Sequence, residues 1–308
     1  HRLQCVIYFL CTPMNEKKIK YLIYAVILII VFGSCSVIDN EYFEEIDNFR
    51  TKRINFLQSR QGYMNLVGLY WIFDGKYTIG SNKRNGIVLP DNFPNYFGTM
   101  HVDKDFIEFT FNEEVLLDST TSILNYKLSK SDLDHSFSWN DLEWYIIKNG
   151  KNLALRVKDF NSPLIKKINE IPIFKPRKSW RIAAKFKSYE EISERVIENI
   201  WGHQVTQPTA GIVSFEYKGN MYELESNIES GKLAVIFKDQ SSGKQTYHGG
   251  RQVYLTDPDE NGNVIIDFNK SFNFPCAYND FTTCPVPPQR NILPFQVDAG
   301  EQYERVKS

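Results

Sequence analysis

The stretch from Asp267 to Pro288 constrains the fold of this chain more than any other. It contains the cysteines Cys276 and Cys284 together with four prolines. Proline has no backbone N–H and a fixed φ, so these prolines exclude a long helix and remove several hydrogen bonds from any sheet. We therefore expect a rigid, folded loop that is pinned onto a sheet and fixes the geometry of any pocket nearby.

The composition predicts a globular protein that is mainly β. Hydrophobic residues make up 42% of the 308 residues, which is enough for a sizeable core. Aromatic residues make up 14% and fall mostly on short alternating stretches, as is typical of strands. The formal net charge of −1 supplies no basic field, so we expect no nucleic-acid partner.

The N-terminal residues have the pattern of an export signal. Met14, which we interpret as the translation start, is followed by lysines, by an apolar run from Tyr21 to Phe32 and by Gly33-Ser34-Cys35. A basic segment, a short apolar segment and small residues before a cleavage site are typical of a secretory signal peptide. The apolar run is shorter than the about 20 residues that span a bilayer comfortably.

Gly33-Ser34-Cys35 resembles a bacterial lipobox. The resemblance implies cleavage before Cys35 and a lipid on its thiol, which makes the membrane a partner of the mature protein. Ser36 is compatible, again by resemblance, with sorting to the outer membrane. The alternative is an uncleaved anchor helix. We expect an exported protein that is lipid-anchored in the bacterial cell envelope.

The body of the chain predicts one helix followed by strands. Residues 42–60 place apolar side chains on one helical face. From residue 66 onward, short apolar stretches bounded by glycine, asparagine and proline predict antiparallel strands. The segment from Glu190 to Glu198 leaves two alternatives open, a short helix or an edge strand.

The run from Tyr77 to Pro90 resembles the opening of a forkhead-associated (FHA) domain, a β-sandwich that reads phosphothreonine. The resemblance covers about residues 68–150. FHA domains place an arginine after the glycine, where this chain has Ser81, and their Ser-x-x-His corner is replaced by residues 94–97. Without that arginine to pair the phosphate, we expect the sandwich to serve as a scaffold.

The second half contains several long motifs, and Gly68-Leu-Tyr-Trp71 accompanies them. They are Phe237-Lys-Asp-Gln-Ser-Ser-Gly243, Thr246-Tyr-His-Gly-Gly-Arg251, residues 267–278, residues 283–288, Asn291-Ile-Leu-Pro294 and Ala299-Gly-Glu301. Together they resemble the family known as domain of unknown function 1684, many of whose members are exported or lipid-anchored. The resemblance implies no particular reaction.

These patterns predict a mainly β fold: an FHA-like β-sandwich, then a second antiparallel β domain in the form of a curved sheet or split barrel, with a short N-terminal helix. We assign residues 1–35 to a leader and lipoprotein signal peptide and residues 36–62 to a tether and helix. The sandwich takes residues 63–171, and the C-terminal β domain with the cysteine loop takes residues 172–308.

Cys276 and Cys284 close a short loop in a chain that carries an export signal, so a disulfide is our leading interpretation. Two buried thiols are the alternative. A zinc site needs further ligands, for which His248 is the candidate. The acidic loop at residues 257–262 lacks the terminal glutamate and the helices of an EF-hand, so we expect no metal there.

Arg251 follows two glycines, an arrangement that suits a small anionic ligand. The interpretation that we favour for Arg251 itself is a structural ion pair with Asp267 on a neighbouring strand. We predict that a small ligand or partner binds through the C-terminal β domain. The predicted ligand-binding residues are Tyr247, Arg251, Asn269, Asn273 and Tyr278.

Two other functions stay open. In a hydrolase-like enzyme, His248, Asp267 and Glu301 would act as acid–base groups around Arg251. In a flavin-type split barrel, Arg251 would hold the phosphate of the cofactor. The sequence contains no Walker loop, Rossmann fingerprint or nucleophile elbow that would name a cofactor or a reaction.

Overall fold

A computed structural model describes residues 40–304 of the chain. The protein is mainly β, with 49% of the described residues in strands and 14% in helices, and residues 40–58 form the predicted N-terminal helix. The predicted fold class is confirmed. By its internal contacts the chain divides into residues 1–49 and 50–308, and both sheets belong to the second unit.

The predicted signal peptide and Cys35 lie outside the described residues. None of the helices within residues 40–304 has both the length and the apolar character needed to span a bilayer.

The first sheet has nine strands in the order β1-β9-β8-β7-β5-β4-β2-β3, with β6 beside β5. Its neighbours are antiparallel except for β2 and β3, which run parallel. The strands are β1 (Leu66–Ile72), β2 (Gly75–Gly80), β3 (Ile87–Val88), β4 (Gly98–Val102), β5 (Phe106–Leu117), β6 (Thr121–Ser129), β7 (Ser136–Trp139), β8 (Leu142–Asn149) and β9 (Asn152–Asp159).

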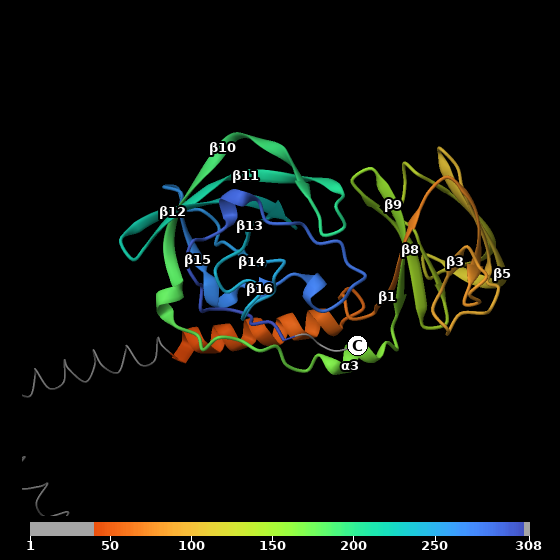
Figure 1. The fold of residues 1–308 in the computed structure, drawn as a ribbon, viewed down its shortest axis with the longest axis horizontal. Coiled ribbons are helices and arrows are strands. Elements are labelled where there is room, and N and C mark those ends of the chain that lie inside the picture. The colour runs from red at the N-terminus through yellow and green to blue at the C-terminus, as the bar shows by residue number, and fades with distance from the viewer. Residues whose placement is uncertain (1–39, 305–308) are drawn as a thin grey trace, which may run out of the picture. The chain divides into compact units, whose positions relative to one another are not determined.

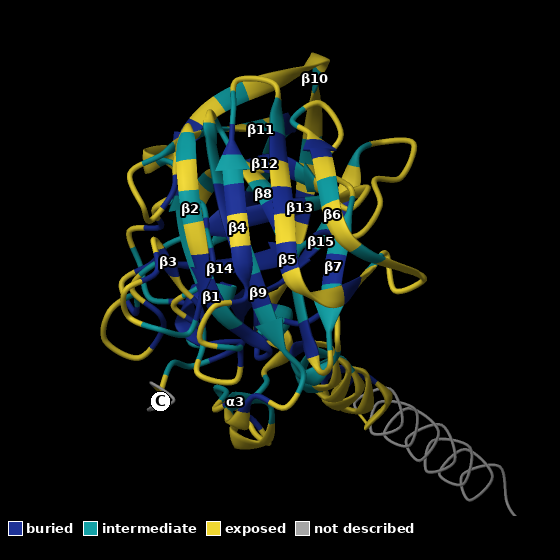
Figure 2. Ribbon diagram, turned by 90° about the vertical axis from the view of Figure 1, so that its right-hand side faces the viewer, coloured by how far each residue is buried: buried dark blue, intermediate teal, exposed yellow. Residues whose placement is uncertain are grey.

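Strand β5 joins two layers of the first sheet, because its first half pairs with β4 and its end pairs with β7. Figure 1 shows β8 and β9 in one layer and β3 and β5 in the other. Buried and exposed residues alternate along β4 and β5, as expected for strands with one face on a core (Figure 2). Between the layers, the rings of Phe97 and Trp144 lie 5.4 Å apart. The FHA-like character of this half stays a prediction.

The second sheet closes into a nearly complete barrel, in the order β15-β10-β11-β12-β13-β14-β16. Leu255, directly after β14, forms an antiparallel bridge to Ile266 of β15, so the two sides of the sheet meet. The segment 190–198 belongs to a strand, β10. The strands are β10 (Arg181–Glu198), β11 (Gln204–Tyr217), β12 (Asn220–Glu229), β13 (Lys232–Phe237), β14 (Arg251–Tyr254), β15 (Asn263–Asp267) and β16 (Phe272–Asn273).

The interior of the barrel is packed with side chains. Phe215, Phe237 and Phe268 are fully or almost fully buried there. The C-terminal strap, which we define as residues 293–303, adds Leu293 and Val297 to the same core. Barrels of this size are filled by their own side chains, so a ligand site is expected on the outer face of the barrel.

The segment from Asp267 to Pro288 is folded onto the second sheet, as its prolines predict. Within it, β16 pairs with β14, and the turns on either side are short 3₁₀ helices. Phe274, Cys276 and Tyr278 share an apolar cluster with Leu57 near the end of the N-terminal helix. The remaining short helices are α3 (Pro163–Lys167), η1 (Lys178–Trp180), η2 (Phe268–Lys270), η3 (Pro275–Ala277) and η4 (Gln289–Asn291).

The C-terminal strap crosses this segment at Gly300. The φ of Gly300 is +77°, and a Cβ there would lie 2.1 Å from Oγ of Ser271. Glycine is therefore required at this position both for the backbone conformation and for the close approach.

Replacing Gly300 tests how tightly the strap is held. Gly219 has the same φ of +77° but nothing within 4 Å of a built Cβ, so it is a matched control. We expect Gly219→Ala to lower the free energy of unfolding by about 1 kcal/mol and Gly300→Ala to lower it by at least about 3 kcal/mol. Urea unfolding followed by circular dichroism measures both. Equal losses would show that the strap does not press on Ser271.

Candidate functional site

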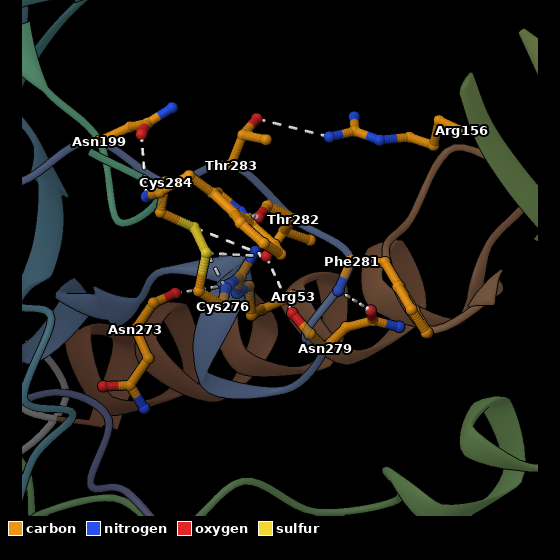
Figure 3. The surroundings of a disulfide bond; sticks show 11 residues. Arg53, Arg156, Asn199, Asn273, Cys276, Asn279, Phe281, Thr282, Thr283 and Cys284 are labelled. Atoms are coloured by element: carbon orange, nitrogen blue, oxygen red, sulfur yellow. Dashed lines mark hydrogen bonds between the residues drawn. A yellow bond between two sulfur atoms is a disulfide. The ribbon is translucent and has the colours of Figure 1, made fainter. Parts of the chain in front are cut away.

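A disulfide joins Cys276 and Cys284, as predicted (Figure 3). Both residues are buried, with 8% and 4% of their surfaces exposed. The backbone N–H of Cys276 donates to Sγ of Cys284, and the hydroxyl of Thr282 donates to Sγ of Cys276. The bond closes the cysteine loop, which we define as residues 276–284.

The cysteine loop is attached to three other parts of the chain. Asn279 donates from Nδ2 to the carbonyl of Leu66 at 2.8 Å, at the start of the first sheet. Trp201, in the turn between β10 and β11, donates from its indole N–H to the carbonyl of Thr282 at 2.9 Å. Arg156 of β9 donates from Nη2 to Oγ1 of Thr283 at 3.4 Å (Figure 3). The loop therefore ties the outer face of the barrel to the first sheet.

A cavity of about 270 Å³ lies beside the cysteine loop. Its walls come from β9 of the first sheet, from the outer face of the barrel, and from the loop itself. The alternation of strands explains the barrel wall, because Phe237 and Val253 point into the barrel core and their neighbours Ile236 and Gln252 point out. The lining residues are Tyr63, Arg156, Gln207, Glu229, Ile236, Gln252, Phe274, Pro275, Thr282, Thr283, Cys284 and Pro285.

Two charged side chains line this cavity. Nε of Arg156 is buried and has no hydrogen-bond partner among the described residues. Glu229 accepts a hydrogen bond from Nε2 of Gln252. Burial raises the pKa of Tyr63 and the negative charge of Glu229 raises it further, whereas Arg53 and Arg156 lower it. The phenol of Tyr63 therefore stays protonated at neutral pH and is available as a donor.

The predicted residue Glu301 belongs to a closed network next to this site. Its Oε2 accepts from the hydroxyl of Tyr278 at 2.6 Å and from the backbone N–H of Asn273 at 2.7 Å. Arg53 approaches Oε1 of Glu301 at 3.4 Å. Burial and the charge of Glu301 raise the pKa of Tyr278 well above its ordinary value. Glu301 and Tyr278 are buried and bond each other, so they hold the loop in place.

Arg251 lies inside the barrel with 0% of its surface exposed. Its guanidinium donates to Oδ2 of Asp239 at 3.3 Å and to the carbonyl of Val297 at 3.0 Å, and it also bonds the carbonyl of Ala299. Burial lowers the pKa of Arg251, and the nearby Asp239 opposes that shift. Arg251 pairs with Asp239 rather than with Asp267, and its burial keeps it from an anionic ligand or a flavin phosphate.

The glycine before Arg251 has a structural reason of its own. Gly250 has a φ of +106°, and a Cβ there would lie 2.7 Å from the carbonyl oxygen of Phe237 and 2.8 Å from Cγ of Pro287. The two glycines of this motif therefore do not mark an anion site. At Gly250 the absence of a side chain lets Pro287 pack against the barrel.

The structure does not bring His248, Asp267 and Glu301 together. His248 is exposed, and its ring lies 4.5 Å from that of Tyr247. Asp267 is buried and accepts from the backbone N–H of Asn269 at 3.1 Å, so it caps η2. No hydrogen bond in the described part of the chain joins any two of these three predicted acid–base groups.

Of the remaining predicted ligand residues, Asn269 has structural partners and Tyr247 is packed among other rings. Asn269 accepts from the backbone N–H of Arg177 and donates to its carbonyl, so it fixes the connector between the two sheets. Tyr247 is buried, and burial raises its pKa to about 12. Within residues 40–304, no three His, Cys, Asp or Glu side chains are grouped to hold a metal ion.

Sequence reasoning missed most of the side chains that line the cavity. Gln207, Glu229 and Gln252 come from three different strands, and Tyr63 follows the N-terminal helix. No spacing in the sequence connects them. The one available signal was Arg156, a cation within the alternating apolar strand β9.

The comparisons with known proteins agree with the resemblance seen in the second half. Residues 166–302 match the model of a family described as "Protein of unknown function (DUF1684)". Residues 166–302 belong to this family. The matched segment contains the cysteine loop and the barrel wall of the cavity, whereas Tyr63 and Arg156 lie before it.

One solved structure that the chain resembles is an uncharacterized protein of Haloarcula marismortui, determined by NMR in solution. The two chains are 28% identical, and the match covers 46% of this chain and 80% of that one, with a TM-score of 0.39. No curated protein matches the chain.

The disulfide gives a direct test of the cysteine loop. Closing so short a loop is expected to contribute about 2–3 kcal/mol to the free energy of unfolding. The double variant Cys276→Ser with Cys284→Ser should lose that amount in urea unfolding. A reductant should destabilise the wild type equally and leave the variant unchanged. A wild type that is reduced, yet as stable as before, would contradict a stabilising role for the bond.

Proposed function

We propose that this protein is a lipid-anchored binding protein of the bacterial cell envelope that holds a small anionic molecule in the cavity beside the cysteine loop. The observation that carries the proposal is the side chain of Arg156. It lines a cavity of about 270 Å³, and its Nε is a buried donor that has no acceptor among the described residues.

The chemistry of Arg156 suits this role. A guanidinium offers several N–H groups in a rigid fork that matches a carboxylate or a phosphate. Its described hydrogen bond, from Nη2 to Oγ1 of Thr283, is long at 3.4 Å. A buried donor without an acceptor destabilises a protein, so an anion that fills the cavity would satisfy Nε.

A binding role is better supported than an acid–base reaction. The groups predicted for catalysis are divided between an exposed His248, a helix-capping Asp267 and a Glu301 that is closed into a buried network. Polar groups that converge on a preformed pocket are what small-molecule sites require. The cavity meets that description through Tyr63 and Gln252, which join Arg156 in its walls.

The localisation rests on the N-terminal sequence. A basic segment, an apolar run and Gly33-Ser34-Cys35 are the parts of a lipoprotein signal. The disulfide supports the same compartment, because such bonds persist in oxidising environments.

Anion binding is measured by isothermal titration calorimetry with acetate, succinate and inorganic phosphate. We expect at least one of these anions to bind, and Arg156→Gln to weaken that binding about 10- to 100-fold, as expected for loss of a charged hydrogen bond. Arg84→Gln is the matched control, because Arg84 is exposed and its loss changes the net charge equally. The proposal fails if none of the three anions binds, or if both variants bind as the wild type does.

The lipid anchor has a separate test in a Gram-negative host. We expect the wild type in the membrane fraction, with labelled fatty acid incorporated into the protein. Cys35→Ala removes the acylated thiol, so this variant should lose the label. Label retained by the variant would rule out lipidation at Cys35.

A further inference from the structure

The cavity is lined by two opposite charges that do not pair with each other. Arg156 bonds the hydroxyl of Thr283, and Glu229 bonds the side-chain amide of Gln252. In the part of the chain that the structure describes, no ion pair joins either side chain to an opposite charge. Glu229 is exposed, whereas Nε of Arg156 is buried without an acceptor, so both charges are open to a ligand that enters the cavity.

The two charges come from different walls. Arg156 is on β9 of the first sheet, whereas Glu229 is the last residue of β12 in the barrel. Both act on Tyr63, whose phenol also lines the cavity. Because the cysteine loop ties the two walls together, the separation of the charges is built into the fold before any ligand arrives. Preorganisation of this kind lowers the entropic cost of binding.

Building on the proposed anion site, we infer that the cavity takes a small zwitterion with a carboxylate at one end and an ammonium at the other. The carboxylate lies on Arg156 and the ammonium on Glu229. A ligand with a single charge satisfies only one wall, whereas a zwitterion satisfies both without adding net charge to the site. Arg156 is partly buried and Glu229 is exposed, so pairing with a ligand stabilises chiefly the guanidinium, and Glu229 supplies a second charged contact.

The size and lining of the cavity fit such a molecule. Its volume of about 270 Å³ corresponds to about nine water molecules, at about 30 Å³ each. This is room for an ω-amino acid or a very short peptide. Ile236 and Phe274 supply apolar surface for a methylene chain, and Gln207 and Thr283 supply neutral polar groups.

A series of amino acids of increasing chain length tests the inference, with binding to the full chain measured by calorimetry. The probes are glycine, β-alanine, γ-aminobutyrate and ε-aminohexanoate, with butyrate and butylamine as ligands that carry one charge each. We expect one length in the series to bind at least about tenfold tighter than butyrate, since it forms a second charged contact. If no amino acid in the series binds more tightly than butyrate, the inference is overturned.

Variants at the two walls separate this inference from the proposed anion site. Glu229→Gln should lower the affinity for the best zwitterion to that for butyrate, and it should leave the affinity for butyrate unchanged. Glu223→Gln, an exposed residue on the same strand, is the control for lost charge. If Glu229→Gln has no effect on binding while Arg156→Gln weakens the binding of every anion, the inference of a zwitterion is wrong and the proposed anion site stands. If Arg156→Gln has no effect, both fail.

Reversing the charge gives a readout that damage to the fold cannot imitate. Glu229→Lys places cations on both walls, so this variant should prefer succinate to γ-aminobutyrate, the reverse of the wild-type order. A variant that keeps the wild-type preference would overturn the inference.

Discussion

The barrel depends on the buried guanidinium of Arg251. Inside the barrel it bonds Asp239 and the carbonyls of the C-terminal strap. A buried cation that lost these partners would strongly destabilise the fold, so the barrel requires the strap in its interior. The strap carries Glu301, and Glu301 fixes the hydroxyl of Tyr278 within the cysteine loop. The wall of the cavity is thus held in place from the centre of the barrel.

Features with a local cause could be predicted from the sequence. The mainly β class follows from short alternating stretches, the N-terminal helix from its apolar spacing, and the folded loop from its prolines. The disulfide was predicted because Cys276 and Cys284 lie close along a chain that carries an export signal. None of these inferences requires knowledge of which strands are neighbours.

The features that were not predicted all depend on strand register. Phe237 pairs with Arg251, which brings Asp239 within reach of the guanidinium, while Asp267 lies opposite Arg181 on another strand. The same alternation turns Arg251 into the barrel and Gln252 out to the cavity. A shift of one residue exchanges the two faces of a strand, and a sequence without a known register cannot decide between them.

The attachment of Trp201 to the loop gives the protein an optical reporter of its own. The indole is 43% exposed, donates to the carbonyl of Thr282 in the cavity wall and lies 5.8 Å from the ring of Trp71. Trp144 and Trp180 sit in the two apolar cores, with 3% of each exposed. Trp139 of β7 is partly buried, so quenchers reach it as well. Of the tryptophans, Trp201 is the most exposed, so the fluorescence that responds to quenchers reports in part on the wall of the cavity without any added label.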